Sequence, residues 1–113
     1  MSFSVLNEER SENSFDLSTG HYFTEEDKKK FGINFEITIN DKEFDLNIEA
    51  VFLFKLDEDL TEEFKLSDFP KINAPAIAFP YLRAFVSNIT LQSGFEPVML
   101  PSINFVSLAE KSE

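Results

Sequence analysis

The sequence contains no cysteine, only three glycines and a single histidine. Without cysteine there is no disulfide framework, no thiolate nucleophile and no cysteine-bound metal. The glycine content leaves no phosphate-binding loop. His21, with Asp16 or Glu25 as its partner, is the one candidate for acid–base chemistry, and a surface histidine in a loop is the simpler interpretation. We therefore predict that the protein is not an enzyme and needs no cofactor.

Long apolar runs and concentrated positive charge are also missing. Carboxylates appear at Glu8 and Glu9 before any signal-like apolar stretch forms, and no apolar run reaches the roughly 18 residues of a membrane span. We expect a cytoplasmic protein with no membrane insertion. The formal net charge is −11, so the surface repels phosphate and we expect no nucleic acid partner. The acidity provides solubility or steers a basic partner toward the surface.

The chain has 113 residues, a length typical of one domain. No stretch rich in Pro, Gly or Ser is long enough to be a linker, so we predict a single domain over residues 1–113. A core of this size buries only about two thirds of the unfolded surface, and we therefore expect a homo-oligomer. Phenylalanine occurs 14 times, which suits either a dense core or an adhesive surface for unfolded chains.

Three segments have the alternating pattern of β-strands. Apolar and polar residues alternate over 33–40 and again over 43–56, with turn residues between them, which predicts a long antiparallel hairpin. Residues 3–17 are predicted to form an edge-like strand whose polar middle bends or bulges. Val51 and Leu53 make the second face of 43–56 apolar as well, so we expect another surface to pack there. Residues 18–32 carry no clear signal.

A helical period runs from about residue 79 to 93. Pro80 suits the first turn, and Gly94 suits the position just after the last one. Arg83 is the only ionised residue in this segment, so we predict that the sheet covers one face and a second subunit covers the other. After Gly94, prolines predict an extended tail over 95–113. The residues predicted to face the sheet are Ala78, Leu82, Phe85, Val86 and Ile89, and those predicted to form the oligomer interface are Tyr81, Ala84, Asn88 and Leu91.

Residues 57–69 are strongly acidic, and we predict a solvated loop with one or two helical turns. Their carboxylates lack the spacing and the glycine of a calcium-binding EF-hand loop, so no metal site is predicted. The whole pattern predicts an α+β fold, with an antiparallel β-sheet of three to four strands packed against one long C-terminal helix.

The C-terminal third contains a series of sequence elements at fixed spacings. The string Ala74-Pro75-Ala76-Ile77-Ala78-Phe79-Pro80-Tyr81-Leu82-Arg83 is followed by Gly94-Phe95-Glu96-Pro97 and then by Leu100-Pro101-Ser102-Ile103-Asn104-Phe105. This arrangement resembles the SecB family of bacterial protein-export chaperones. In that family Phe-Pro-Tyr opens the long helix, a glycine closes it, and a Pro-rich segment leads to an Asn-Phe pair.

The resemblance implies a sheet with a long helix against it, assembled as dimers and then as a dimer of dimers through the helices. It also implies apolar grooves that hold unfolded or pre-folded polypeptides without ATP, and transfer of these clients to the translocation motor SecA. A phenylalanine-lined groove buries the exposed apolar side chains of such clients with little demand on their sequence. The residues expected to bind polypeptide are Tyr22, Phe23, Phe31, Val51 and Leu53.

Docking of SecA in the family uses acidic residues spaced four apart on the first strand, and the resemblance places Glu12 and Asp16 at these positions. The family also uses an acidic residue on the last strand, where this chain has Asn47, flanked by Asp45 and Glu49. At this position the chain therefore departs from the family pattern.

Family members continue after the Asn-Phe pair with a second helix and an acidic tail, whereas this chain is expected to lack that helix. The departure favours an alternative function, a SecB-like chaperone dedicated to one client, such as an antitoxin, or a mobile-element adaptor without a role in export. A third interpretation is a small-ligand binder with a phenylalanine-rich cavity. Such a protein would saturate with one compact ligand and would not suppress the aggregation of unrelated proteins.

Overall fold

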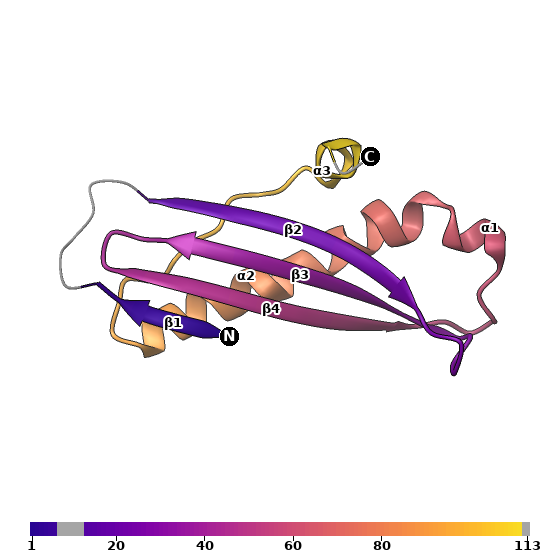
Figure 1. The fold of residues 1–113 in the computed structure, drawn as a ribbon, viewed down its shortest axis with the longest axis horizontal. Helices are drawn as coiled ribbons and strands as arrows, with labels where there is room; N and C mark the ends of the chain where they lie inside the picture. The colour runs from indigo at the N-terminus through magenta and orange to yellow at the C-terminus, as the bar shows by residue number, and fades with distance from the viewer. Residues whose placement is uncertain (7–12, 112–113) are drawn as a thin grey trace.

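The computed structural model describes residues 1–6 and 13–111 (Figure 1). One antiparallel sheet and one long helix dominate it, which confirms the predicted α+β class. No helix in the described residues is long and apolar enough to cross a membrane. The elements are β1 (Ser2–Val5), β2 (Ser14–Phe23), β3 (Lys30–Asn40), β4 (Phe44–Lys55), α1 (Glu62–Lys65), the single π-helical turn η1 (Phe69–Asn73), α2 (Ala74–Gln92) and α3 (Phe105–Lys111).

The sheet has the strand order β1-β4-β3-β2, and every neighbouring pair is antiparallel. β3 and β4 form the predicted hairpin, whose turn is closed by a 2.9 Å hydrogen bond from the N–H of Asp41 to the carbonyl of Phe44. β1 pairs with β4 and β2 pairs with β3. The strands β1 and β2, which follow each other in the sequence, therefore lie on opposite edges of the sheet. The hairpin therefore lies at the centre of the sheet.

The single strand predicted over 3–17 is wrong, because β1 and β2 are separate strands on opposite edges of the sheet. The polar stretch between them contains residues 7–12, which lie outside the described residues. β2 instead continues to Phe23 and includes the part of 18–32 that carried no clear signal. Phe15, Leu17 and Phe23 all turn the same way along β2, as the alternation of a strand requires.

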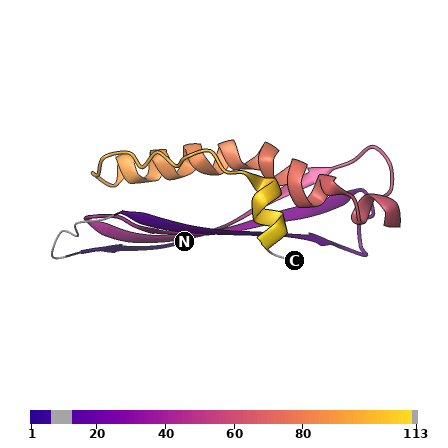
Figure 2. The same cartoon turned by 90° about the horizontal axis from the view of Figure 1, so that it is seen from above.

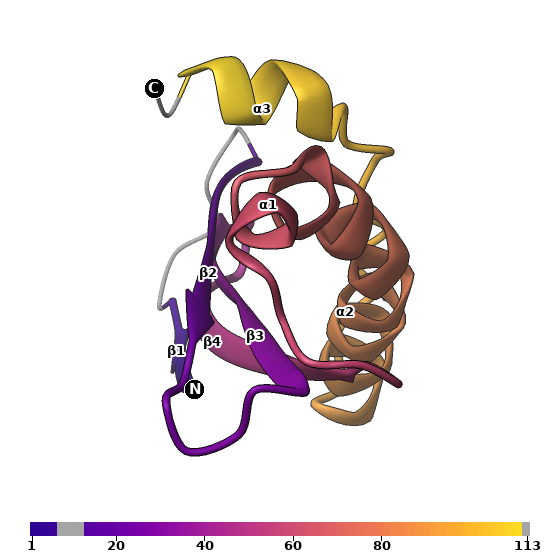
Figure 3. The ribbon, with the colours of Figure 1, turned by 90° about the vertical axis from the view of Figure 1, so that its right-hand side faces the viewer.

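The core lies between one face of the sheet and α2 (Figures 2 and 3). Odd-numbered residues of β3 and even-numbered residues of β4 point toward the helix, as the alternation of 33–40 and 43–56 predicted. From α2, Ala78, Leu82 and Val86 are buried against them. Phe85 was predicted to share this face but is 46% exposed, because it lies at the border of the buried stripe. Within residues 1–6 and 13–111, no helix covers the opposite face of the sheet.

α2 begins at Ala74, before the predicted start at residue 79, and follows η1 directly. Pro80 lies inside the helix, where it removes only one backbone hydrogen-bond donor. Burial of Ala74, Pro75, Ala78 and Phe79 favours the extra turn. At the other end, the N–H of Phe95 bonds to the carbonyl of Thr90 and that of Gly94 to Leu91, while Gly94 has a φ of 91°. These are the two bonds of a Schellman helix end.

The extended tail predicted over 95–113 is wrong for its last part, because α3 occupies residues 105–111. The side chain of Asn104 accepts a 3.1 Å hydrogen bond from the N–H of Ser107 and caps this helix. The buried ring of Phe105 lies 5.6 Å from that of Phe79 and 6.3 Å from that of Phe35, measured between ring centroids. A helix is therefore present where none was expected, so the end of the chain does not favour a client-specific role.

Candidate functional site

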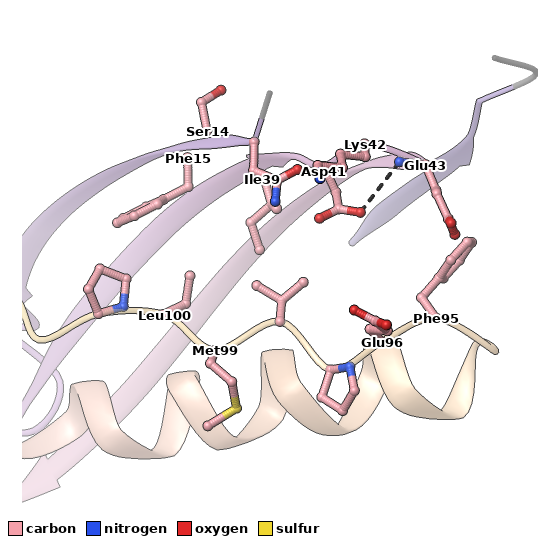
Figure 4. Close-up of a pocket in the computed structure, with 14 residues that line it drawn as sticks. Ser14, Phe15, Ile39, Asp41, Lys42, Glu43, Phe95, Glu96, Met99 and Leu100 are labelled. Atoms are coloured by element: carbon pink, nitrogen blue, oxygen red, sulfur yellow. Dashed lines mark hydrogen bonds between the residues drawn. The ribbon is translucent and has the colours of Figure 1, made fainter. Parts of the chain in front are cut away.

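A groove of about 550 Å³ opens between one end of the sheet and the segment that follows α2 (Figure 4). The start of β2 and the β3–β4 turn form one wall, and residues 95–101 form the other. Phe15 and Ile39 point from the sheet toward this segment, and Leu100 points back toward them. The lining residues are Asn13, Ser14, Phe15, Ile39, Asp41, Lys42, Glu43, Phe95, Glu96, Pro97, Val98, Met99, Leu100 and Pro101.

The wall formed by residues 95–101 is held in place at two points. The buried hydroxyl of Thr90 donates to the carbonyl of Val86 at 2.9 Å and accepts from the N–H of Val98 at 3.0 Å. The ring of Phe95 packs against the rings of Phe44 and Phe3, with centroid distances of 4.6 and 5.7 Å. Because these anchors belong to α2 and the sheet, the groove is built into the fold before any ligand arrives.

The charge at the groove is mainly negative. Asp41, Glu43 and Glu96 contribute carboxylates, and Lys42 contributes the one ammonium group among the lining residues. The surface that the groove exposes is more polar than apolar, since Ile39 and Leu100 are almost completely buried. Together with its acidic residues, this surface fits an extended polypeptide segment that carries basic and some apolar side chains. The residues that line the groove include no cysteine or histidine.

The groove was not among the sites predicted from the sequence. Its second wall forms only because the chain turns back at Gly94 and then packs along α2, and sequence alternation carries no information on that packing. One signal was present, since Gly94 followed by Pro97 and Pro101 marks a sharp turn into an extended segment. This signal predicted an extended segment after Gly94 but not that the segment lies beside the start of β2.

The residues predicted to bind polypeptide lie away from this groove. Tyr22, Val51 and Leu53 point out from the bare face of the sheet, where Leu53 is 67% exposed. Tyr22 and Leu53 lie on the same row of the sheet, because both are paired with Gly32, and Val51 lies on an adjacent row of the same face, where it is paired with Asn34. The ring of Tyr22 lies directly over Gly32, in the space that a Cβ atom would occupy. We call Tyr22, Val51 and Leu53 the outer apolar patch.

Phe31 and Phe23 do not belong to this patch. Phe31 is 1% exposed and stacks against Phe54 in the core, so the prediction that it contacts clients is wrong for the folded protomer. The cause is the alternation of β3, which turns every odd-numbered side chain toward the helix layer. Phe23 is half-buried on that same inner side, beneath the ammonium group of Lys65, which lies 5.5 Å from the ring centroid.

The bare face of the sheet is acidic at the end away from the outer apolar patch. Asp16 lies there, in the row that continues through Thr38 to Asn47, and the side chain of Asn47 donates a 2.8 Å hydrogen bond to the hydroxyl of Thr38. Glu36, Asp45 and Glu49 occupy neighbouring rows on this face. Glu12, the other residue predicted to dock a partner, lies outside the described residues.

A continuous stripe of uncharged side chains runs along the side of α2 that faces away from the sheet. Its members include Tyr81, which is 69% exposed, and the exposed Leu91. The spacing of four, three, four and three residues is that of a heptad repeat, which is typical of helices that pack against other helices. The α2 stripe consists of Ile77, Tyr81, Ala84, Asn88 and Leu91, and it contains all four residues predicted for the oligomer interface.

His21 lies within β2 on the inner side of the sheet, which separates it from Asp16 on the bare face. The acid–base pair considered for these two residues is therefore absent from the structure. Burial lowers the pKa of His21 below its usual value, and the positive charge of Lys71 lowers this pKa further. The ring packs edge-on against Phe23 at a centroid distance of 5.5 Å.

The lowered pKa of His21 predicts a loss of stability in mild acid. The unfolded chain takes up the proton near pH 6.5, whereas the folded chain takes it up only at a lower pH. The free energy of unfolding should therefore fall as the pH drops below about 6.5, until the pH has passed the lowered pKa. Urea unfolding at several pH values measures this slope. His21→Gln should flatten it, and an unchanged slope in that variant would contradict the assignment to His21.

Comparison with known proteins gave consistent matches. The sequence profile of the family described as Preprotein translocase subunit SecB matches residues 2–113. An uncharacterized protein of Methanocaldococcus jannaschii is 37% identical over 60% of this chain and 43% of its own length. The protein-export protein SecB of Anaplasma phagocytophilum is 39% identical over 55% of this chain and 39% of its own length. The chain thus matches less than half the length of these two relatives.

Two further comparisons cover most of the chain. The protein-export protein SecB of Magnetococcus marinus is 28% identical over 95% of this chain and 68% of its own length. Among solved structures, a SecB-like chaperone of Mycobacterium tuberculosis, in complex with a ChAD peptide from the HigA1 antitoxin, superimposes with a TM-score of 0.64. That alignment covers 90% of this chain and 81% of the other, at 18% sequence identity. It confirms the predicted fold.

Proposed function

Because the chain belongs to the SecB family, we propose that it is a holdase chaperone that binds unfolded or pre-folded polypeptides without ATP. The observation that carries this proposal is the preformed groove between the sheet and residues 95–101, with the ring of Phe15 pointing into it and carboxylates around it. A non-native chain exposes the apolar side chains that such a groove can bury. Complete burial of one large apolar side chain contributes roughly 1.5–3 kcal/mol, so a few contacts give useful affinity without a defined sequence.

We extend the client surface to the outer apolar patch and to Phe23 as secondary contacts. Tyr22, Val51 and Leu53 present a flat apolar area on the bare face of the sheet. A flat surface buries less of each client side chain than a groove does, so its contribution per contact is smaller. Two separate contact areas would let a long client bind at more than one point, which raises the overall affinity.

We propose that the protein acts as a homo-oligomer in which the α2 stripe is buried between subunits. The stripe is apolar or uncharged throughout, and a lone surface helix would ordinarily carry charges on its outward side. Heptad spacing allows the same stripe on a second copy to pack against it around a two-fold axis. The family resemblance implies this arrangement of helices as well.

For a role in export, the acidic part of the bare sheet face is the proposed docking surface for SecA. Asp16 lies on the edge strand β2, with Glu36, Asp45 and Glu49 on nearby rows of β3 and β4. Clustered carboxylates on a flat face attract a basic partner and speed its association. Glu12 belongs to the same proposal through its position in the sequence.

The alternative is a chaperone dedicated to one client. The M. tuberculosis protein with the same fold was solved with an antitoxin peptide, which favours this alternative. The two functions differ in client range and in the need for SecA. A general holdase suppresses the aggregation of unrelated proteins, whereas a dedicated chaperone protects one client and ignores the others.

The groove proposal predicts a specific loss of client binding in Phe15→Ala. Phe15 points into the groove from β2, so removing its ring should weaken binding of a fluorescently labelled unfolded polypeptide by about tenfold or more. Ser18→Ala is the matched control, because Ser18 lies further along β2 on the bare face of the sheet and is not among the residues that line the groove. Circular dichroism verifies that both variants remain folded. Equal binding by the wild-type protein and folded Phe15→Ala would show that the groove is not the client site.

A further inference from the structure

A cluster of phenylalanine rings lies at the end of the sheet that is remote from the groove. The ring of Phe31 is central to it, with centroid distances of 5.2 Å to Phe54 and 5.7 Å to Phe64. Phe64 and Phe69 lie 5.6 Å apart and belong to α1 and η1, so these two short elements cover the cluster. We call this cluster the aromatic corner, and it consists of Phe23, Phe31, Phe54, Phe64 and Phe69.

The cover formed by α1 and η1 is short and irregular. α1 has four residues, and η1 is a five-residue π-helical turn. Helices of this length are unstable by themselves, so packing on the aromatic corner must hold them in place. Within α1, Lys65 and Glu62 form an exposed ion pair at 3.4 Å, which contributes little. The cover is therefore expected to open at a lower free energy than the whole domain.

His21 lies where this cover meets the sheet. It belongs to the edge strand β2, and its ring is on the inner side, against which η1 packs. The ring contacts Phe23 of the aromatic corner edge-on, and its partner on β3 is the fully buried Ile33. These neighbours are apolar, so a charge on His21 would have poor solvation while the cover is closed.

The charges near His21 are positive on both elements of the cover. Lys71 of η1 acts directly on it, because burial and then the ammonium group of Lys71 lower the pKa of the imidazole. Lys65 of α1 lies over the adjacent ring of Phe23, 5.5 Å from its centroid. α3 also packs against η1, and its charged residues are Glu110 and Lys111. A proton on His21 thus adds a second positive charge opposite Lys71.

We propose that His21 makes this cover sensitive to pH: in mild acid its ring takes up a proton, and η1 and α1 then separate from β2 and expose the aromatic corner. In the closed form the imidazolium would be half-buried beside an ammonium group, whereas in the open form water solvates both. The sheet, α2 and the groove stay in place. The exposure of apolar rings at this end of the molecule thereby depends on pH.

The direction of the response follows from linkage. The open form takes up the proton near the ordinary histidine pKa of 6.5, and the closed form takes it up only at a lower pH. Opening is therefore favoured as the pH falls below about 6.5, and the effect levels off once the pH has passed the lowered pKa. Client binding plays no part in this equilibrium, so the inference stands or falls separately from the holdase proposal.

Hydrogen exchange followed by mass spectrometry locates the opening. The amides of 62–73 should exchange at a lower free energy of opening than those of 33–40. Their protection, corrected for the intrinsic effect of pH on exchange, should fall severalfold between about pH 7.5 and about pH 5.5. Equal protection of the two segments would show that the domain opens only as a whole and would overturn the proposal.

Substitutions at His21 separate its charge from its packing. His21→Gln should abolish the acid response of 62–73. His21→Arg carries a permanent charge and should show the low protection of the acid form already at neutral pH. An acid response of His21→Gln equal to that of the wild-type protein would overturn the proposal.

Lysine variants test the repulsion. Lys71→Gln should reduce the acid response of 62–73, because it removes the like charge that opposes protonation of His21. Lys42→Gln is the matched control, since Lys42 lies at the opposite end of the sheet, in the β3–β4 turn. Equal responses of these two variants would contradict the repulsion between His21 and Lys71.

A dye that fluoresces on apolar surfaces tests what the opening exposes. The wild-type protein should bind more of the dye in mild acid, and His21→Gln should bind the same amount at both pH values. A wild-type protein with the exchange response but constant dye binding would refute exposure of the aromatic corner.

Discussion

Leu82→Asp is expected to abolish the folded state. Leu82 is 1% exposed at the middle of α2, directly over the sheet. Replacing a buried leucine by alanine alone costs about 2–5 kcal/mol, and an unpaired buried carboxylate adds a large desolvation penalty. The sum approaches the whole stability of a typical domain, about 5–15 kcal/mol. Circular dichroism and urea unfolding measure the outcome.

Leu82→Ala serves as the graded version of this prediction. It should leave the protein folded but lower the free energy of unfolding by about 2–5 kcal/mol. The matched control is Ala76→Glu, on an exposed position of the same helix, where little change in stability is expected. Wild-type stability of Leu82→Asp would show that α2 does not pack on the sheet as described.

The second large effect is expected from the double variant Tyr81→Asp and Leu91→Asp, which should dissociate the oligomer while the protomer stays folded. Both side chains are exposed in the protomer and lie on the α2 stripe. In a two-fold interface each substitution occurs twice, and each buried large side chain contributes roughly 1.5–3 kcal/mol. The dissociation constant should therefore rise by at least about a thousandfold.

Light scattering and sedimentation measure this loss, and circular dichroism verifies the fold. Ala76→Glu is again the control, because Ala76 lies on the same helix away from the α2 stripe. An unchanged oligomer mass in the double variant would remove the α2 stripe from the assembly. An unfolded double variant would instead show that Tyr81 and Leu91 support the protomer itself.

The central hairpin and the long helix were predictable because local patterns determine them. Ile33, Phe35 and Ile37 alternate with polar residues, and the same alternation in β4 set the face that each strand buries. The scarcity of charge on α2 predicts, in the same local way, that a second subunit covers the far side of this helix. In both cases the information is contained within one element.

The remaining features depend on contacts between distant segments. The start of α2 was misplaced because Pro80 is typical of a helix start, yet burial of the preceding turn outweighs the one lost hydrogen bond. α3 was missed although Asn104 is a good helix cap, since the helix forms only when Phe105 docks on Phe35 and Phe79. Phe31 was misassigned because the start of β3 was not recognised, and with it the inward direction of that side chain.

In the candidate site, too, some features follow from local patterns and others depend on contacts between distant segments. The acidic and apolar residues of the bare sheet face were singled out from the sequence, and the structure places Tyr22, Val51 and Leu53 together there. The groove required knowledge that residues 95–101 lie beside the start of β2, which no local pattern provides.

The most direct test of the holdase function is suppression of aggregation of two unrelated unfolded proteins, at stoichiometric amounts and without nucleotide. The oligomer mass is recorded in the same samples. The proposed function predicts that the wild-type protein suppresses the aggregation of both and remains oligomeric, whereas Phe15→Ala protects both less well. Suppression of neither protein by a folded oligomer would contradict a general holdase and leave the client-specific chaperone as the function of this SecB-family chain.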